Sequence, residues 1–445
     1  MRLLAIGNQA FQREVGGILF RLNVEVETAH DPEEIREKLK WDDIDLVVFD
    51  YDYYYSPDTQ RRLSLIRAMA NSHRPFIVVS SLKDPAAIAE AKSEGASDYI
   101  VKPYNQREFI LRFNALAQGK IRVSCIGGGT GLFTLLLGLK TLPDVLLTSI
   151  VSMSDDGGSS GKISQTFGIL PPGDIRRSLV ALSNAPELMN EIMQHRFEKG
   201  GELHGHSFGN IFLTVLAEVK GSMSEAVRAL SDILNIQGIV LPAATTPTRL
   251  VARFEGGAIV KGESKIDLGA DRAPDLHIEE LWHEPPPECD ADAYTAIMNA
   301  DVVTIGPGDL FTSVITNLVI KNFRDAVVRS RAKKIYVCNL MTKPGETADF
   351  RALDHIREVL KYLGGDHLDA VLLSNTGLSQ EAIEEYARKG QSPVAPGDLD
   401  EIRKLTKAEI VLADVGNETE LVRHDSQKLK NEIWKIIQRI APPHG

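Results

Sequence analysis

Two adjacent carboxylates, Asp155 and Asp156, close a predicted buried strand in the stretch LLTSIVSMSDDGGSSGKI. Adjacent acids at the carboxyl end of a strand can hold magnesium, bind a ribose hydroxyl or orient an acceptor hydroxyl for attack. The small residues that follow them leave space for a ligand. An Asx-turn with a helix cap explains either Asp equally well. We therefore treat both residues as the candidate catalytic and magnesium-binding groups if the protein transfers a group.

A glycine-rich joint precedes these acids in VSCIGGGTGLFTLLLGLK, from Val123 to Lys140. The apolar run before the glycines predicts a buried strand, and the leucines after them have helical spacing. Such a turn presents free N–H groups and the positive end of a helix to a phosphate, and glycine lets the phosphate approach closely. The joint lacks the third glycine of the dinucleotide fingerprint and the Lys-Ser/Thr of a P-loop. A tight structural turn is the alternative interpretation.

Polar loops follow several further predicted elements, and they read PPGDIRRSLVALS, HGHSFGNIFL, GPGDLFTS and CNLMTKPGET. Arg176 and Arg177 fall in the first turns of a predicted helix, where a cation is unfavourable unless an anion or acid lies nearby. His204 and His206 are candidate general acids or bases, although loop histidines are as often satisfied by backbone hydrogen bonds. Loops of this composition at successive strand ends predict a polar site along one edge of a parallel sheet.

Residues 1–119 form a separate predicted unit. The strand-like runs RLLAIGN, VEVETA, DLVVFD, FIVVSS and DYIVKPY alternate with helical patterns, which predicts a flavodoxin-like (βα)5 parallel sheet with its crevice at the carboxyl ends of the strands. Asp50, Ser80 and Lys102 fall at those ends. This spacing resembles the receiver domain of two-component response regulators. The resemblance implies that Asp50 is the phospho-acceptor, Ser80 the switch hydroxyl and Lys102 the phosphate-pairing cation, and that a signalling partner exists.

The turn after the first strand departs from the receiver pattern. Receivers carry an acidic pair there to hold magnesium, whereas this chain reads IGNQ, with Asn8 and Gln9. Without those carboxylates the cation loses most of its oxygen ligands, and phosphoryl transfer loses its main charge neutraliser. A degenerate receiver that docks or dimerises is therefore the alternative to phosphorylation at Asp50. The domain boundary is predicted between Gly119 and Lys120.

Residues 120–445 are predicted to form a larger Rossmann-like, doubly wound α/β domain. Its motifs GGGTGL, DDGGSSG, PPGDIR, GHSFGN, GPGDLFTS and CNLMTKPGET resemble, in that order, those of the YvcK/CofD-like family, which includes gluconeogenesis factors and 2-phospholactate transferases. The resemblance extends to LVRHD, and the wording of its motifs is more similar to the YvcK branch. By position it assigns ligand contacts to Gly127, Gly128, Gly129, Thr130, Gly131, Asn210, Gly306, Gly308, Thr312 and Ser313. Arg176, Ser207 and Lys343 are further candidate ligand contacts, the two cations as groups that would offset phosphate charge.

Two functions of different classes follow from the resemblance. The YvcK branch implies a regulator that binds UDP-sugars such as UDP-N-acetylglucosamine and is tied to carbon metabolism, cell wall and cell shape. The transferase branch implies magnesium-dependent transfer of a 2-phospholactyl-type group from a guanosine diphosphate donor to a deazaflavin hydroxyl. The motif wording favours the regulator, and whether the protein is an enzyme stays open.

Composition limits the remaining classes. The formal net charge of −11 argues against a nucleic-acid partner, and the chain shows no apolar run of membrane-span length. The opening MRLLAIGN is too short and too weakly charged to predict a signal peptide, and the three cysteines form no CxxC pair. We therefore expect a cytoplasmic protein that forms a homo-oligomer. Magnesium is the one cofactor anticipated, and no tightly bound organic cofactor is predicted.

Overall fold

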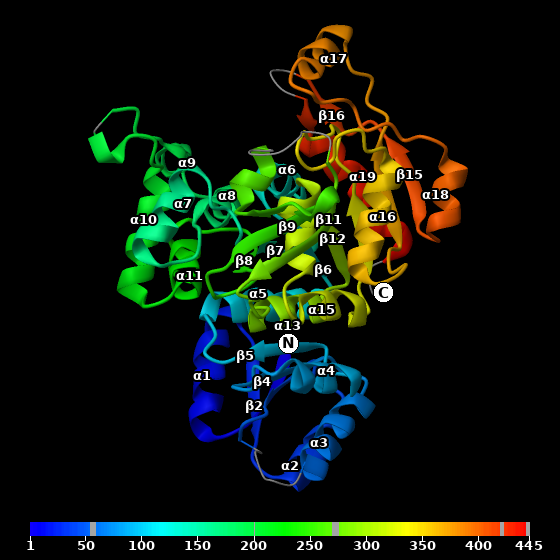
Figure 1. Cartoon of the computed structure of the whole chain (residues 1–445). Coiled ribbons are helices and arrows are strands. Elements are labelled where there is room, and N and C mark those ends of the chain that lie inside the picture. The colour runs from blue at the N-terminus through cyan, green and yellow to red at the C-terminus, as the bar shows by residue number, and fades with distance from the viewer. Residues whose placement is uncertain (54–58, 200, 269–275, 419–421, 442–445) are drawn as a thin grey trace.

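Two α/β units follow one another along the chain in the computed structural model (Figure 1). The structure describes residues 1–53, 59–199, 201–268, 276–418 and 422–441. A five-stranded sheet lies in the N-terminal unit and a seven-stranded sheet in the larger one. The predicted fold class, a flavodoxin-like receiver domain and a larger Rossmann-like domain, is therefore confirmed.

The N-terminal sheet is parallel throughout and has the order β2-β1-β3-β4-β5. Strands β3 and β4 are buried along their whole length, so their apolar runs face helices on both sides. The strands are β1 (Arg2–Ile6), β2 (Glu25–Ala29), β3 (Leu46–Asp50), β4 (Phe76–Ser80) and β5 (Asp98–Val101). The helices are α1 (Gln9–Leu19), α2 (Pro32–Lys38), α3 (Thr59–Asn71), α4 (Pro85–Ser93) and α5 (Gln106–Ala117), with a 3-10 turn, η1 (Phe20–Leu22).

Polar caps start these helices where the sequence changes from turn to helix. Asn8 accepts a hydrogen bond from Phe11 N at the start of α1, and Asp31 accepts from Glu33 N and Glu34 N at the start of α2. Such caps satisfy N–H groups that have no partner within the helix. The turn after β1 therefore uses Asn8 as a cap.

The larger sheet is also parallel, with the order β15-β14-β13-β12-β6-β7-β8. The order reverses direction between β6 and β12, so the carboxyl ends of these two strands border the crevice expected for a ligand. The strands are β6 (Ile121–Gly127), β7 (Val145–Val151), β8 (Ile239–Pro242), β12 (Val302–Ile305), β13 (Lys333–Val337), β14 (Ala370–Ser374) and β15 (Glu409–Ala413).

Helices cover both faces of this sheet. Buried side chains of α6, α8, α10, α11 and α19 join one hydrophobic cluster, and those of α13, α15 and α16 join another. The helices are α6 (Gly129–Leu139), α7 (Gly158–Phe167), α8 (Gly173–Leu182), α9 (Glu187–Gln194), α10 (Phe208–Lys220), α11 (Met223–Ile233), α13 (Ala291–Asn299), α14 (Thr316–Leu318), α15 (Phe323–Arg329), α16 (Ala352–Leu363), α17 (Gln380–Ala387), α18 (Leu399–Leu405) and α19 (Ser426–Ile440). Within the described residues, none has both the length and the apolar character needed to cross a bilayer.

A small antiparallel sheet lies beside this core. Its strands are β9 (Arg249–Phe254), β10 (Ile259–Lys261) and β11 (Ile278–Glu284), in the order β10-β9-β11, and η3 (Glu255–Gly257) joins the first two. Strands β9 and β10 are antiparallel and form a hairpin whose turn contains Gly256 and Gly257. A short helix, α12 (Glu263–Leu268), follows it, and a two-stranded ribbon of β16 (Gly416–Asn417) and β17 (Arg423–His424) lies near the C-terminus. One further turn, η2 (Gly201–Leu203), precedes α10.

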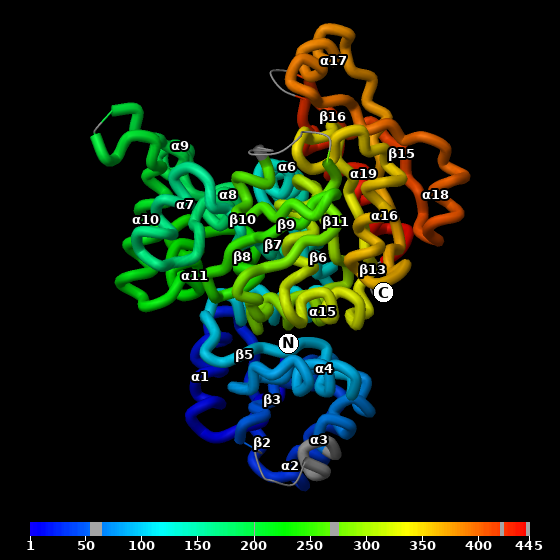
Figure 2. Tube along the Cα trace, in the orientation of Figure 1, coloured from blue at the N-terminus to red at the C-terminus, as the bar shows by residue number. Residues whose placement is uncertain are grey.

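The chain passes between the domains directly from α5 to β6. In Figure 2 the blue trace of the receiver domain lies below the rest of the chain. Helix α13 packs against β5 and α4, and this contact buries polar groups from both domains. The Arg112 guanidinium donates to Asp98 Oδ2 at 2.9 Å, and Asn299 Nδ2 donates to Tyr99 O at 3.3 Å and to the Asp98 carboxylate. Arg122 also donates to Ser97 O at 2.7 Å. The two domains are therefore joined by a buried polar contact as well as by the chain.

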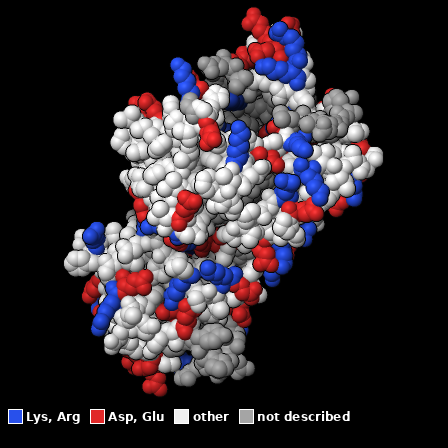
Figure 3. Space-filling view, turned by 60° about the vertical axis from the view of Figure 1, so that its left-hand side comes forward, with Lys and Arg blue, Asp and Glu red and all other residues white. Residues whose placement is uncertain are grey.

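Charged side chains of both signs are interspersed on the face of the molecule shown in Figure 3. Among the described residues of that face, Lys and Arg side chains form no broad field of positive charge of the kind that nucleic-acid binding requires. The absence of a nucleic-acid partner stays a prediction, as does the expected homo-oligomer.

Candidate functional site

The glycine joint forms the predicted turn between β6 and α6. Gly128 caps the helix without a side chain, and Gly129 N donates to the Asp174 carboxylate at 2.8 Å. A Cβ on Gly128 would lie 2.7 Å from that carboxylate, and one on Gly131 would lie 2.6 Å from Pro307 O. The glycines therefore bring the turn against two neighbouring loops. Within the described residues, the N–H groups of Thr130 and Gly131 have no hydrogen-bond partner, so they remain available to an anion.

The paired carboxylates are separated by the fold. Asp155 Oδ1 accepts from Gly157 N at 3.0 Å, which is the Asx-type turn that the sequence allowed, and Asp155 also lines the pocket beside the glycine turn. Asp156 Oδ1 instead accepts from Ser264 N at 2.8 Å, at the start of α12. Asp155 is therefore the member of the pair that can contact a ligand or cation in this pocket, while Asp156 anchors the neighbouring α12.

A second loop faces the glycine turn across the crevice. It runs from Gly306 to a π-helix, η4 (Leu310–Ile315), whose first N–H groups donate to the buried Glu346 carboxylate. Thr312 Oγ1 also donates to Glu346, at 2.7 Å. Glu346 thus occupies the position at this helix end that a phosphate would take. Gly308 and Ser313 remain on the side of the pocket.

Together these loops enclose a pocket of about 580 Å³ at the carboxyl ends of β6 and β12. This volume falls within the range of small-molecule sites. The predicted residues that line it are Gly128, Gly129, Thr130, Gly131, Asp155, Gly308, Ser313 and Lys343.

Three predicted ligand contacts lie behind the pocket. Arg176 is buried and donates to Met193 O at 3.2 Å, and burial lowers its pKa to about 10. Asn210 Nδ2 donates to Ser159 Oγ at 3.2 Å, and Ser207 N donates to the same oxygen at 3.3 Å. The Ser159 contacts hold α7 against the start of α10, and the Arg176 contact holds α8 against α9. Gly127, Gly306 and Thr312 are likewise buried beneath the lining.

Other lining residues come from segments far apart in the sequence. Arg177, adjacent to Arg176, lies 3.4 Å from Asp174 and faces the pocket. Glu263, the first residue of α12, also lines the pocket. Further lining residues from later parts of the chain are Asp309, Asn339, Thr342, Tyr386, Lys389, Gln391, Arg423 and His424. The DIRR motif indicated a cation at the start of this helix. Only the packing of α8 determines that Arg177, and not Arg176, faces the pocket.

Carboxylates crowd one wall of the pocket, and their pKa values are raised. Burial, followed by repulsion from Asp155, raises the pKa of Asp174 to about 6 and that of Glu263 to about 9. A divalent cation would relieve this repulsion, and carboxylate oxygens are the ligands that magnesium prefers. Within the described residues, however, the oxygens of Asp155, Asp174 and Glu263 do not lie close enough together to form a ready metal site, so magnesium binding beside Asp155 stays a prediction.

A lysine neutralises a second acidic group deeper in the site. Lys343 Nζ lies 2.5 Å from Asp309 Oδ2 and 3.8 Å from Glu346 Oε1, and it also contacts the Asp267 carboxylate. These three acids offer oxygens close enough together for a metal ion, but the ammonium group already supplies the countercharge. Burial lowers the pKa of Lys343, and the three carboxylates more than reverse that effect, so the net shift is upward.

The receiver domain contains a second polar cluster at its strand ends. Lys102 Nζ lies 2.6 Å from Asp50 Oδ1 and 3.1 Å from Asp52 Oδ2. Ser80 Oγ donates to Asp52 Oδ1 at 2.7 Å, and Ser81 N donates to both oxygens of Asp52. The three residues predicted from the receiver pattern are therefore brought together. The carboxylate of Asp52, which the sequence analysis did not single out, bridges Ser80 and Lys102.

Comparisons with known proteins divide the chain in a similar way. Residues 123–415 match the family model described as 2-phospho-L-lactate transferase CofD, and residues 7–114 match that of the response regulator receiver domain. The putative gluconeogenesis factor of Thermotoga maritima is 40% identical over 319 residues, which is 71% of this chain and 99% of that protein. The gluconeogenesis factor of Bacillus subtilis is 38% identical over 319 residues, covering 72% of this chain and 99% of its own length.

One relative matches a longer part of the chain: the putative gluconeogenesis factor of Nostoc is 41% identical over 354 residues, or 78% of this chain and 75% of that protein. A crystal structure of a Bacillus halodurans protein superposes with a TM-score of 0.67 at 36% identity, covering 71% of this chain and 99% of the other. The chain therefore belongs to the CofD family together with these gluconeogenesis factors, and it carries a response regulator receiver domain at its N-terminal end.

Proposed function

We propose that the protein is a regulator of the gluconeogenesis-factor type that binds a nucleotide sugar of the UDP-N-acetylglucosamine class. The observation that carries this proposal is the glycine-turn pocket, which is lined both by the turn with the unpaired N–H groups of Thr130 and Gly131 and by Arg177, whose Nη1 would lie 3.9 Å from a Cβ placed on Gly129. Backbone donors and a guanidinium together suit a diphosphate. On this proposal, ligand occupancy links carbon metabolism to cell-wall synthesis and cell shape.

The outer residues of the pocket support a ligand larger than a diphosphate. Tyr386 and Gln391 offer an aromatic ring and an amide for the sugar or base, while Lys389 and Arg423 add positive charge. If magnesium accompanies the diphosphate, Asp155 is the carboxylate best placed to hold it, with Asp174 and Glu263 beside it. Asp156 contributes indirectly, by anchoring α12.

Calorimetric titration of the purified chain with UDP-N-acetylglucosamine, UDP-glucose and GDP, each with and without magnesium, tests this proposal. We expect saturable binding of the UDP-sugars. Arg177→Gln should weaken it by on the order of tenfold, because a charge-assisted hydrogen bond contributes about 1.5 kcal/mol or more. Arg403→Gln, on the exposed face of α18, is the matched control and should bind like the parent chain. Unchanged binding by Arg177→Gln would remove the pocket from the proposal.

The alternative proposal is a transferase of the 2-phospho-L-lactate type, and the matching family description supports it. In that case a guanosine diphosphate donor would occupy the same pocket with magnesium, and a deazaflavin hydroxyl would be the acceptor. Asp155, the member of the acidic pair that lines the pocket, would orient that hydroxyl. Magnesium-dependent binding of GDP without binding of UDP-sugars, followed by phospholactyl transfer to a deazaflavin, would establish the transferase and overturn the regulator.

For the receiver domain we propose a docking or signalling role that does not require phosphorylation of Asp50. The contacts of Asp52 with Ser80 and Lys102 support this role, because these groups would otherwise bind the phosphoryl oxygens. We further propose a homo-oligomer, which sedimentation of the full chain would test.

A further inference from the structure

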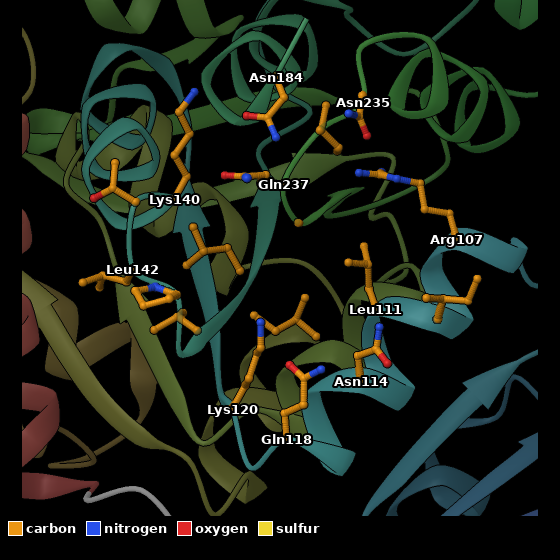
Figure 4. Close-up of a pocket in the computed structure, with 18 of the residues that line it drawn as sticks. Arg107, Leu111, Asn114, Gln118, Lys120, Lys140, Leu142, Asn184, Asn235 and Gln237 are labelled. Carbon is orange, nitrogen blue, oxygen red and sulfur yellow. The ribbon is translucent and has the colours of Figure 1, made fainter. Parts of the chain in front are cut away.

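A groove of about 1270 Å³ lies between the two domains, apart from the pocket described above. One wall is helix α5 of the receiver domain, and the other consists of the segments around Lys140, Asn184 and Asn235 (Figure 4). The groove borders the amino ends of β7 and β8, whereas the nucleotide pocket borders carboxyl ends. A ligand in this groove would therefore contact both domains without entering the nucleotide pocket.

Amide side chains dominate the polar lining of the groove. Within the part of the chain that the structure describes, six of them make no side-chain hydrogen bond, namely Gln106, Asn114, Gln118, Asn184, Asn235 and Gln237. Each such amide offers both donors and an acceptor. This combination matches the alternating N–H and C=O groups of an extended polypeptide backbone. Apolar side chains, including Leu111 and Leu142, lie between the amides.

Three cations also line the groove: Arg107, Lys120 and Lys140. Arg107 and Lys120 form no salt bridge to any residue that the structure describes. Asp232 is the acid among the described lining residues: it accepts a hydrogen bond from Asn105 at 3.2 Å, and its charge attracts Arg107 without forming a salt bridge. Figure 4 shows Arg107 reaching from α5 toward Gln237 on the opposite wall, and Lys120 pointing toward the same hollow.

The desolvation of these cations supports an anionic occupant. Burial lowers the pKa of Arg107 and of Lys140, so both charges are held partly out of water. Lys140 donates to Ser183 O at 3.1 Å but lacks a carboxylate partner among the described residues. A carboxylate placed between the walls would offset this cost. The chain as a whole has a net charge of −11 and therefore repels an acidic partner elsewhere. A basic groove would then direct such a partner to this part of the surface.

The size and lining of the groove favour a peptide over a small molecule. Its volume exceeds the roughly 300–1,000 Å³ that is usual for small-molecule pockets. None of the described residues that line it is aromatic, although single-stranded nucleic acids and nucleobases are usually bound by stacking on aromatic rings. We propose that this interdomain groove binds an extended acidic segment of a partner protein, through Arg107, Lys120 and the lining amides.

Fluorescence anisotropy with the full-length protein tests the proposal. The probe is a short fluorescein-labelled peptide of alternating Glu and Ser, and the matched control peptide replaces each Glu by Gln. We expect saturable binding of the acidic peptide that weakens as salt is raised. The double variant Arg107→Glu with Lys120→Glu should bind the peptide at least about tenfold more weakly, whereas Lys404→Glu on α18 should leave binding unchanged.

Four outcomes would overturn the proposal. The first is no saturable binding of the acidic peptide. The second is that the Gln peptide binds as tightly as the acidic peptide, or that the double variant, with the melting temperature of the parent chain, binds the acidic peptide as tightly as the parent does. The third is displacement of the peptide by lower concentrations of tripolyphosphate or stronger binding of a labelled oligothymidine, which would assign the groove to a small polyanion or a nucleic acid. The fourth is a dimer that dissociates in the double variant, because the occupant would then be a second copy of this chain. UDP-sugar titration of the same double variant shows whether the pocket beside the glycine turn still binds its ligand. Loss of peptide binding with unchanged UDP-sugar binding would then belong to the groove alone, so the two proposals can fail separately.

Discussion

At the residue scale, Asp52 and Glu263 bring carboxylates into the two polar sites, and neither was singled out in the sequence. Asp52 lies two positions beyond the predicted acceptor, where a turn returns its carboxylate to Ser80 and Lys102. Burial raises the pKa of Asp52, but hydrogen bonds from Ser80 and Lys102 more than offset this, so its net pKa is lowered. The carboxylate is therefore held ionised against the groups that would receive a phosphate.

We predict that the wild-type chain is not phosphorylated by acetyl phosphate in the presence of magnesium. Asn8 and Gln9 supply no carboxylate for the cation, and Asp52 already occupies Ser80 and Lys102. Intact-mass measurement after incubation checks this. The combined variant Asn8→Asp with Asp52→Ala should acquire phosphate, and Asp50→Asn in that background should not. A phosphate mapped to Asp50 in the wild-type chain would contradict the prediction.

We predict that Glu263 makes stability fall as pH rises in the presence of a chelator. Its folded-state pKa is about 9, above the unfolded value of about 4. Between these two pKa values the folded protein holds a proton that the unfolded chain has released. The free energy of unfolding therefore falls as pH rises from about 4 toward about 9, and below about 4 the group has no effect on it. Melting temperatures measured between mildly acidic and alkaline pH should decline less steeply in Glu263→Gln. Glu401→Gln, on exposed α18, is the control, and an unchanged slope in Glu263→Gln would contradict the prediction.

At the scale of elements, the strand-to-helix turn after β6 depends on its contact with the loop after β12. Gly131 lies in the first turn of α6, and a Cβ there would approach Pro307 O to 2.6 Å and Gly308 N to 2.9 Å. The backbone atoms of a neighbouring loop cannot rotate away as a flexible side chain would. The glycine is therefore required by packing between two loops as well as by access to a ligand.

We predict that Gly131→Ala destabilises the larger domain by about 1–3 kcal/mol and weakens UDP-sugar binding, because overpacking displaces the loop that lines the pocket. Gly16→Ala in α1 is the matched control: a Cβ there meets nothing within 4 Å. That change should be neutral or stabilising by up to about 1 kcal/mol. Thermal melting and titration of both variants check this, and equal behaviour would show that the contact with Pro307 is relaxed at little cost.

At the scale of the whole molecule, the receiver domain and the larger domain share a buried interface. Asp98 and Arg112 are almost inaccessible to solvent, and Asn299 of α13 completes their hydrogen bonding from the other domain. Breaking a buried charge network is costly because the remaining charges lose their partners. The interface is therefore expected to make the two domains unfold together.

We predict that Asn299→Asp separates the domains in thermal unfolding, because it places a second carboxylate against Asp98. Calorimetry should show two transitions where the parent chain shows one, and limited proteolysis should cleave faster near Gly119. Asn105→Asp introduces the same change opposite exposed Asp232 and retains a helix-capping side chain, so it should leave a single transition. Two transitions in the parent chain itself would refute the proposed coupling.

Local sequence patterns determined the elements, the order of the loops and the family resemblance. Buried parallel strands leave continuous apolar runs, and glycine turns with polar residues mark their carboxyl ends, so these features need no long-range information. The pattern also indicated that Gly129, Asp155, Ser313 and Lys343 would gather on one side of the sheet. Only the tertiary structure decided which adjacent residue faces the pocket: Asp155 over Asp156, and Arg177 over Arg176. A side chain's direction depends on the packing of its element against distant segments, such as α12 and α10, and single-sequence spacing does not contain that packing. The interdomain groove was equally out of reach, because its two walls are brought together only by the docking of α5 against the larger domain.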